Sequence, residues 1–151
     1  MSRPLISRTK PDALKGLLRA DYATDLTSQH PTVQDANFLW DRFERNANPL
    51  IKINFDGVLQ EVRSISTTPT GRMQLKDEDH AFVFCVYLMS VVSLPEGECT
   101  RVLRRPKQVL LSHYQAICEQ ALSRSNIFCI TNTTLIRAIL LYIVICTHYP
   151  S

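Results

Sequence analysis

The densest group of titratable residues is Asp77-Glu78-Asp79-His80, directly before the longest apolar run of the chain. Carboxylates and an imidazole are the residue types of general acid–base catalysis. Catalysis requires such groups to converge in a cleft, whereas these four are neighbours in sequence. Acidic residues in a first helical turn oppose the helix dipole and accept hydrogen bonds from free amides. We therefore interpret the group as a helix start, with His80 half-exposed at the junction.

The histidines and cysteines form no recognisable metal or nucleophile pattern. Four histidines, at positions 30, 80, 113 and 148, and five cysteines, at 85, 99, 118, 129 and 146, share no metal-ligand spacing. Ser112 and His113 are adjacent, so on a helix their side chains point about 100° apart, which does not pair a nucleophile with a base. The sequence contains no glycine-rich phosphate loop. We predict no catalytic, cofactor-binding or metal-binding residue. The sequence leaves open whether the protein is an enzyme, and the missing catalytic pattern argues against enzymatic activity.

Four basic residues, Arg101, Arg104, Arg105 and Lys107, gather across one predicted helix junction. They could hold phosphates or an acidic partner, but solvated charge between helices is the more frequent arrangement. The formal net charge of +3, from 17 basic and 14 acidic residues, is too small to indicate nucleic-acid binding by phosphate neutralisation. We predict no direct contact with nucleic acid.

The composition predicts one helical domain. The 151 residues are 45% hydrophobic and 21% charged, and only four are glycine, which favours helices over a sandwich or barrel. An odd number of cysteines in apolar segments is typical of free thiols in a reducing compartment. The N-terminus lacks the apolar stretch of a secretory signal. These features predict an intracellular protein.

The central feature is the run from Asp77 to Leu94, in which positions 81–94 hold only apolar residues and two serines. A run without a polar face is a helix buried on all sides or a strand buried on both, and its length favours the helix. It is shorter than the roughly 20 residues that span a bilayer. We predict a buried central helix and no membrane segment.

The other predicted helices surround this one. Asp12 caps a short helix to Ala20, and Thr32 with Asp35 caps the next. Residues 64–74 read as the clearest loop. The further helices are expected at about 56–65, 95–103, 106–125 and from a cap at 131 or 132 to about 146. The fold class is thus all-α, an irregular bundle of about six to seven helices around residues 77–94. The nearly all-apolar last helix must pack on the central helix, on another protein or on a missing continuation, and in the last case the bundle is a truncated version of a larger domain.

Two domain-level predictions follow from this pattern. Residues 1–30 form an N-terminal segment with one short helix, and residues 31–151 form the helical domain.

The side chains predicted in the core, on helical spacing and apolar character, are Trp40, Phe43, Phe84, Leu88, Tyr114 and Leu140. The aromatic pair near position 40 is interpreted as core rather than as a ligand cage.

Several phrases in this order resemble the regulatory middle region of fungal binuclear zinc-cluster transcription factors. They are Leu39-Trp40-x-x-Phe43, Asn46-x-x-Pro49-Leu-Ile-Lys-Ile, Ser93-Leu-Pro-Glu-Gly-Glu-Cys99 and Pro106-Lys-x-Val-Leu-Leu-x-x-Tyr114-x-x-x-x-Glu119. The resemblance covers about residues 30–146. It implies an all-helical regulatory domain and a link to the control of secondary-metabolite genes. It also implies a nuclear location, whereas the composition alone is equally compatible with a cytoplasmic one. The six-cysteine cluster is missing from this chain, so neither zinc nor DNA reading carries over.

The leading hypothesis is a transcription-factor-like protein that acts through protein contacts, with a homologous regulator or with itself. A second hypothesis is a small helical enzyme or ligand-binding accessory of a fungal biosynthetic pathway, enclosing an apolar molecule between the central and last helices. A third is a gene-model fragment without a function of its own. The excess of apolar surface on the last helix supports the first two, because a nearly all-apolar helix needs a covering partner.

Overall fold

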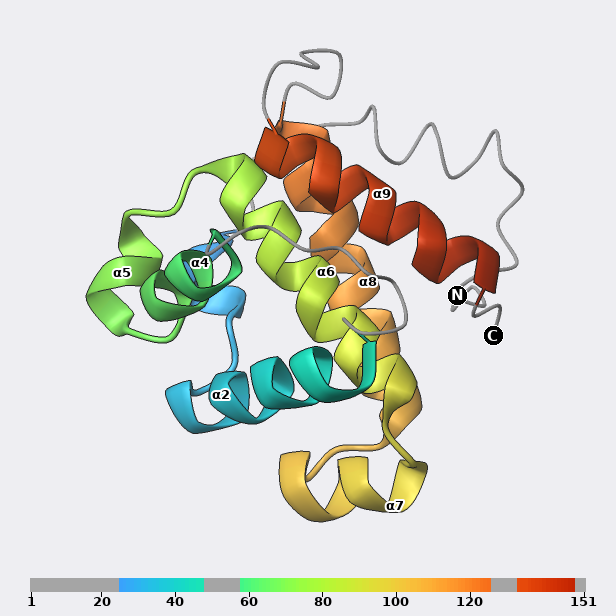
Figure 1. The fold of residues 1–151 in the computed structure, drawn as a ribbon. Helices are drawn as coiled ribbons and strands as arrows, with labels where there is room; N and C mark the ends of the chain where they lie inside the picture. Colours follow the sequence, from blue (N-terminus) through green and yellow to red (C-terminus); the bar gives the residue numbers. More distant parts are fainter. Residues whose placement is uncertain (1–24, 48–57, 126–132, 149–151) are drawn as a thin grey trace.

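The central apolar run forms α6 (Asp77–Ser93), and the other helices pack around it (Figure 1). The computed structural model describes residues 25–47, 58–125 and 133–148, and in these ranges the chain is all-α, as predicted. The remaining elements are η1 (Thr27–Gln29), α2 (Val33–Arg42), η2 (Phe43–Ala47), α4 (Val58–Ser66), α5 (Pro69–Met73), α7 (Glu96–Glu98), η3 (Cys99–Leu103), α8 (Lys107–Arg124) and α9 (Thr133–His148).

The start of α6 is a capped turn, which confirms that the acidic group before the apolar run begins a helix. The Asp79 carboxylate accepts a hydrogen bond from the Lys76 amide at 3.2 Å. Every residue from His80 to Val91 is buried. The one serine in that stretch, Ser90, donates to the backbone, with the carbonyls of Val86 and Leu39 as acceptors. A buried hydroxyl is therefore satisfied, and it also contacts α2.

Three long helices meet α6 on different sides. α8 lies along it and makes the most extensive contact, α9 packs on another side, and α2 crosses near its C-terminal half (Figure 1). The C-terminus of α6 is capped from α8, because the Lys107 ammonium donates to the carbonyls of Val92 at 3.0 Å and Leu94 at 2.7 Å. A cation at this end also complements the helix dipole. α6 is thus the helix against which α2, α8 and α9 are positioned.

The Thr32 cap of α2 is confirmed. Its hydroxyl accepts a hydrogen bond from the Asp35 amide at 3.1 Å. The two aromatic residues predicted as core here, Trp40 of α2 and Phe43 of η2, are fully buried, with ring centroids 6.2 Å apart. The Trp40 indole donates to the Ser66 hydroxyl at 3.1 Å. This bond links α2 to the end of α4.

The prediction of a loop over residues 64–74 is wrong, because this stretch ends α4 and contains α5. Thr68 caps α5 through the Gly71 amide at 3.0 Å, and Pro69 occupies the first helical turn. The α4–α5 corner is tight: a Cβ on Gly71 would lie 2.1 Å from the Ile65 carbonyl oxygen. The proline and glycine that suggested a loop have other roles here. Pro69 begins a helix, and Gly71 allows two backbone segments to approach closely.

Five of the six predicted core residues are buried, namely Trp40, Phe43, Phe84, Leu88 and Tyr114. Leu140 is the exception, because its side chain is 53% exposed. Five other positions of α9 are buried where it packs on α6 and α8: Leu135, Ala138, Leu141, Tyr142 and Ile145. Leu140 stands two positions after Ala138, about 200° around the helix, and so points outward.

Other boundaries agree with the sequence. The expected helices at 95–103 and 106–125 correspond to α7 with η3 and to α8, and Pro95 and Pro106 both act as N-caps. The predicted helix at 12–20 and the cap at 131 or 132 lie outside the described residues. In the described part of the chain, no single helix has the length and apolarity to cross a membrane; α6 and the Glu96–Leu103 segment meet those criteria only as a pair, bent by 119°.

Candidate functional site

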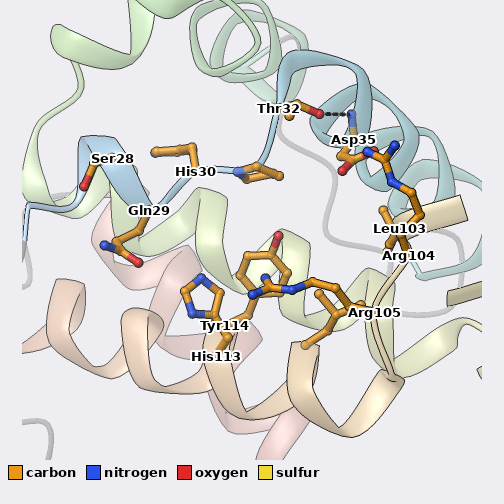
Figure 2. A pocket seen from close by; sticks show the side chains of 12 residues that line it. Ser28, Gln29, His30, Thr32, Asp35, Leu103, Arg104, Arg105, His113 and Tyr114 are labelled. Atoms are coloured by element: carbon orange, nitrogen blue, oxygen red, sulfur yellow. Dashed lines mark hydrogen bonds between the residues drawn. The ribbon is translucent and has the colours of Figure 1, made fainter. Parts of the chain in front are cut away.

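A pocket of about 490 Å³ opens between η1, the start of α2 and the start of α8 (Figure 2). Its lining comes from four elements that are far apart in sequence: η1 and its C-terminal residues, the first turn of α2, the end of η3, and α8. Because α6 holds both α2 and α8, the pocket depends on the packed core rather than on one local motif.

The floor of the pocket is aromatic and belongs to α8. Tyr114 is 4% exposed, and the ring of His113 lies beside it with centroids 5.1 Å apart. Burial raises the pKa of the Tyr114 hydroxyl above its ordinary value. Burial also lowers the pKa of His113, and the nearby Arg105 charge adds to that effect, while a hydrogen bond with the backbone of Gln29 opposes it. The floor therefore presents two neutral rings at neutral pH.

One wall of the pocket is His30, which is held by α6. Its Nε2 lies 2.9 Å from Nδ1 of His80, and its Nδ1 lies 3.2 Å from the Tyr87 hydroxyl. The imidazole also packs against the Phe84 ring, with centroids 4.5 Å apart. Burial, then the charges of His80 and Arg72, lower the pKa of His30 to about 3. His30 is thus neutral, and a neutral pair of imidazoles can share one N–H donor and one acceptor.

His80 differs from the prediction, because it is 4% exposed rather than half-exposed. Burial lowers its pKa, and the charge of Asp77 opposes that effect. The partner that allows this burial is His30, fifty positions away in sequence. Nothing in the local sequence around position 80 indicates that contact.

A buried cation lies behind the His30 wall. Arg72 of α5 is 9% exposed, and its Nε donates to the Ser66 carbonyl at 2.7 Å. Its Nη2 atom has no hydrogen-bond partner in the described part of the chain. The Arg72 charge acts on two pocket residues: it lowers the pKa of His30, and it opposes the increase in the pKa of Tyr114 that burial causes.

Two exposed arginines form the rim, at the junction of η3 and α8. Arg104 has φ of 60°, the one non-glycine residue with positive φ in the ranges that the structure describes. Figure 2 shows the Arg105 side chain extending across the pocket toward Tyr114 and His113, and the Arg104 side chain directed toward Asp35. The left-handed turn at Arg104 ends η3 and orients both side chains.

The basic group predicted from sequence is therefore divided. Arg104 and Arg105 line the pocket, whereas Lys107 caps α6 and Arg101 is exposed on η3. The prediction of solvated charge holds for Arg101, but it is wrong for Lys107, which is bonded to two backbone carbonyls. No signal in the sequence distinguished these roles, because they depend on where α8 meets α6.

A second polar cluster lies between α8 and α9. Glu119 and Gln115 are polar residues of α8 but are only 8% and 6% exposed. The Tyr142 hydroxyl donates to the Glu119 carboxylate at 2.5 Å, and the Gln115 amide donates to it at 3.2 Å. Burial raises the pKa of Tyr142 well above its ordinary value. This cluster satisfies polar groups where α9 covers α8.

The cysteines of the described residues are free thiols. Cys85 of α6 and Cys118 of α8 lie side by side in the core, and the Cys85 sulfur also lies 3.6 Å from the Ala138 carbonyl oxygen of α9. Within the described ranges, no three histidine, cysteine or acidic residues are placed to hold a metal ion.

Comparison with known proteins gives three relatives. The chain is 30% identical over 137 residues to transcriptional regulator nsrM of Aspergillus novofumigatus, and 29% identical over 129 residues to the aurofusarin cluster transcription factor aurR2 of Gibberella zeae. It is 28% identical over 120 residues to transcriptional regulator AacuB of Aspergillus aculeatus. The chain is similar to fungal transcriptional regulators.

The similarity extends over most of this chain, since the three alignments cover 91%, 83% and 80% of it. The chain spans only 16–19% of the length of these curated relatives. No family model and no solved structure matches it. The relatives support the resemblance to fungal transcriptional regulators. The more specific predictions, a zinc-cluster family and its regulatory middle region, stay predictions.

Proposed function

We propose that the chain is a regulatory segment of a fungal transcriptional regulator of secondary-metabolite genes and that it acts through protein contacts. The observation that carries this proposal is the alignment of 120–137 residues with three fungal regulators, one of which is named for a biosynthetic gene cluster. A nuclear location belongs to the same proposal. The activity of the whole relatives does not transfer, because the aligned part is a small share of each.

The outward face of α9 is the surface that we assign to the protein contact. Leu140 is 53% exposed and Ile143 is 49% exposed, and they stand three positions apart on one side of the helix. The opposite side of α9 is buried against α6. Two large neighbouring apolar side chains on an otherwise apolar helix are typical of a contact with another protein. The partner we propose is a homologous regulator.

The domain boundary remains a proposal as well. We assign the regulatory segment to residues 31–151. Residues 26–30 pack with it, because His30 contacts His80 and Phe84, and Leu26 is buried.

A reporter assay tests the regulatory function. The 151-residue chain is placed between a heterologous DNA-binding domain and an activation domain, and reporter output is compared with that of a flexible linker of equal length. We expect output to change by at least about fivefold, the size of a typical coupling between sites. Equal output from the chain and the linker would contradict the proposal.

Two variants separate the protein contact from the fold. Leu140→Asp with Ile143→Asp should abolish both the reporter effect and capture of the full-length regulator nsrM in a pull-down. Val109→Asp is the matched control, because Val109 is 47% exposed on a different helix, α8. If the control reduces capture as much as the α9 variant does, the assigned face is wrong.

A further inference from the structure

We infer that the pocket between η1, α2 and α8 binds a small aromatic carboxylate. This inference goes beyond the proposed function and does not depend on it, because binding is a property of the isolated chain. It rests on the charge, the shape and the floor of the pocket.

The charge around the pocket is positive. Arg104 and Arg105 line it, and Arg72, which is not a lining residue, lies close enough to His30 for its charge to act on that imidazole. Asp35 is the one carboxylate among the lining residues. His30 and His113 are neutral at neutral pH and so neither add to this excess nor oppose it. A concave site with excess positive charge concentrates anions.

The shape of the rim suits a carboxylate. A guanidinium presents a planar fork of donors that matches the two oxygens of a carboxylate. In Figure 2 the Arg105 side chain spans the pocket above the aromatic floor, with its guanidinium near Tyr114 and His113. A carboxylate paired with this group would therefore carry its ring over that floor.

The size and the accessible planar groups favour a planar body. Tyr114, Leu103 and Leu110 line the pocket but are almost fully covered by the protein. The half-buried His113 ring and the exposed Arg105 guanidinium therefore supply the accessible planar surface. A volume of about 490 Å³ falls in the range of roughly 300–1,000 Å³ that is usual for small-molecule sites. Inorganic phosphate would fill little of this volume and would leave the half-buried His113 ring uncovered, so an anion with a planar body fits the pocket better.

The backbone at Arg104 is an independent observation. A non-glycine residue in the left-handed region is strained, and such residues cluster at ligand-binding sites. Here the strained residue is itself a rim residue of the pocket. Glycine would end η3 with less strain but would remove one of the two rim cations.

The test uses the full 151-residue chain, with 1-naphthoate as the probe and 1-naphthamide as its uncharged isostere, in isothermal titration calorimetry at neutral pH. We expect 1-naphthoate to bind with a Kd below about 1 mM and the amide to bind at least about tenfold more weakly. Equal binding of the two compounds, or no binding of 1-naphthoate at about 10 mM, would overturn the inference.

Charge variants locate the site. Arg105→Gln should weaken 1-naphthoate binding at least about tenfold. Arg101→Gln is the matched control, because Arg101 is exposed on η3 and does not line the pocket. Unchanged binding in Arg105→Gln, or an equal loss in both variants, would overturn the assignment. Tighter binding of hexaglutamate than of 1-naphthoate would overturn it in favour of an acidic peptide.

Discussion

The half-buried His30 and the buried His80 are held as neutral groups because each supplies the other with a hydrogen-bond partner. The ring nitrogens lie 2.9 Å apart, and the Tyr87 hydroxyl occupies the second nitrogen of His30. Arg72, close enough to affect the pKa values of His30 and Tyr87, disfavours a further positive charge. The contact between the two imidazoles therefore requires both rings to be neutral, so the stability of the fold depends on pH.

Stability should decrease as pH falls from about 7.5 to 5.5. The folded pKa of His30 is about 3 against an ordinary value of 6.5, so the unfolded chain binds the proton more readily between these values. The lowered pKa values of His80 and His113 act in the same direction. We expect His30 alone to contribute a loss of about 1 kcal/mol in the free energy of unfolding.

Urea denaturation at the two pH values measures this loss. The His30→Gln variant should show a smaller difference between them, because one group that prefers to be neutral is removed. Both pH values lie above the usual range of carboxylates, which limits their contribution. An equal or larger pH dependence in the variant would show that other groups are responsible.

Arg104 is the residue at which backbone preference and side-chain placement conflict. Its φ of 60° is a conformation that glycine adopts without steric penalty. Replacing it by glycine should therefore raise the free energy of unfolding by up to about 1 kcal/mol. Chemical denaturation measures the change.

Arg105→Gly is the control for the Arg104 substitution, since Arg105 does not have positive φ. It should leave the protein equally stable or less stable. A destabilising effect of Arg104→Gly would mean that side-chain contacts at this position outweigh the strain.

At the scale of the element, α6 and α9 differ although both are strongly apolar. α6 is covered on every side over its middle turns, whereas α9 is covered on one side only. Hydrophobicity alone does not distinguish these two situations, because each sequence has few polar residues to mark an outer face.

Substitution of one leucine in each helix distinguishes them. Leu88 of α6 is 1% exposed, so Leu88→Ala should lower the free energy of unfolding by roughly 2–5 kcal/mol. Leu140→Ala on the outer face of α9 should change it by less than about 0.5 kcal/mol. A loss below about 1 kcal/mol for Leu88→Ala would contradict the burial of α6.

The α4–α5 corner depends on the absence of one side chain. A Cβ on Gly71 would lie 2.1 Å from the Ile65 carbonyl oxygen, so Gly71→Ala should destabilise the protein by about 1–3 kcal/mol. At Gly97 nothing lies within 4 Å of such a Cβ, and Gly97→Ala should be neutral or stabilising. Thermal unfolding of the two variants tests the corner; equal midpoints would contradict it.

At the scale of the molecule, α6 contacts α2, α8 and α9 extensively, and no other element of the described ranges does so; removal of a covering helix therefore exposes the central apolar surface (Figure 1). Five buried residues of α9 cover that surface. Each large apolar side chain contributes about 1.5–3 kcal/mol when buried, and a typical domain has only about 5–15 kcal/mol of net stability. The chain should not fold cooperatively without α9.

Truncation after residue 132 tests this dependence. We expect loss of a cooperative thermal transition in circular dichroism and increased binding of anilinonaphthalene sulfonate. The Leu140→Asp, Ile143→Asp variant is the control, because it changes only the outer face of α9 and should retain the transition. A cooperative transition in the truncated chain would show that α9 is dispensable for the fold.

The sequence was sufficient for the helices but less so for the site. Thr32 with Asp35, the acidic turn before α6, and Pro95 and Pro106 marked helix starts that the structure confirms, because capping hydrogen bonds and the restricted φ of proline are local properties. The pocket was not predicted, although Arg104 and Arg105 had been singled out as candidates. Its other members come from η1, α2 and α8, and their convergence depends on how these elements pack.

By itself, the sequence determined the all-α class, the central place of α6 and the inward stripe of α2, because these follow from periodicity, capping and the scarcity of glycine. The tertiary structure alone decided that His80 and Glu119 are buried, that Lys107 caps α6, and that Leu140 faces outward. Each of these depends on contacts between residues distant in sequence. Burial of a polar or apolar side chain depends on which partner the fold brings to it, and sequence spacing within one helix does not contain that information.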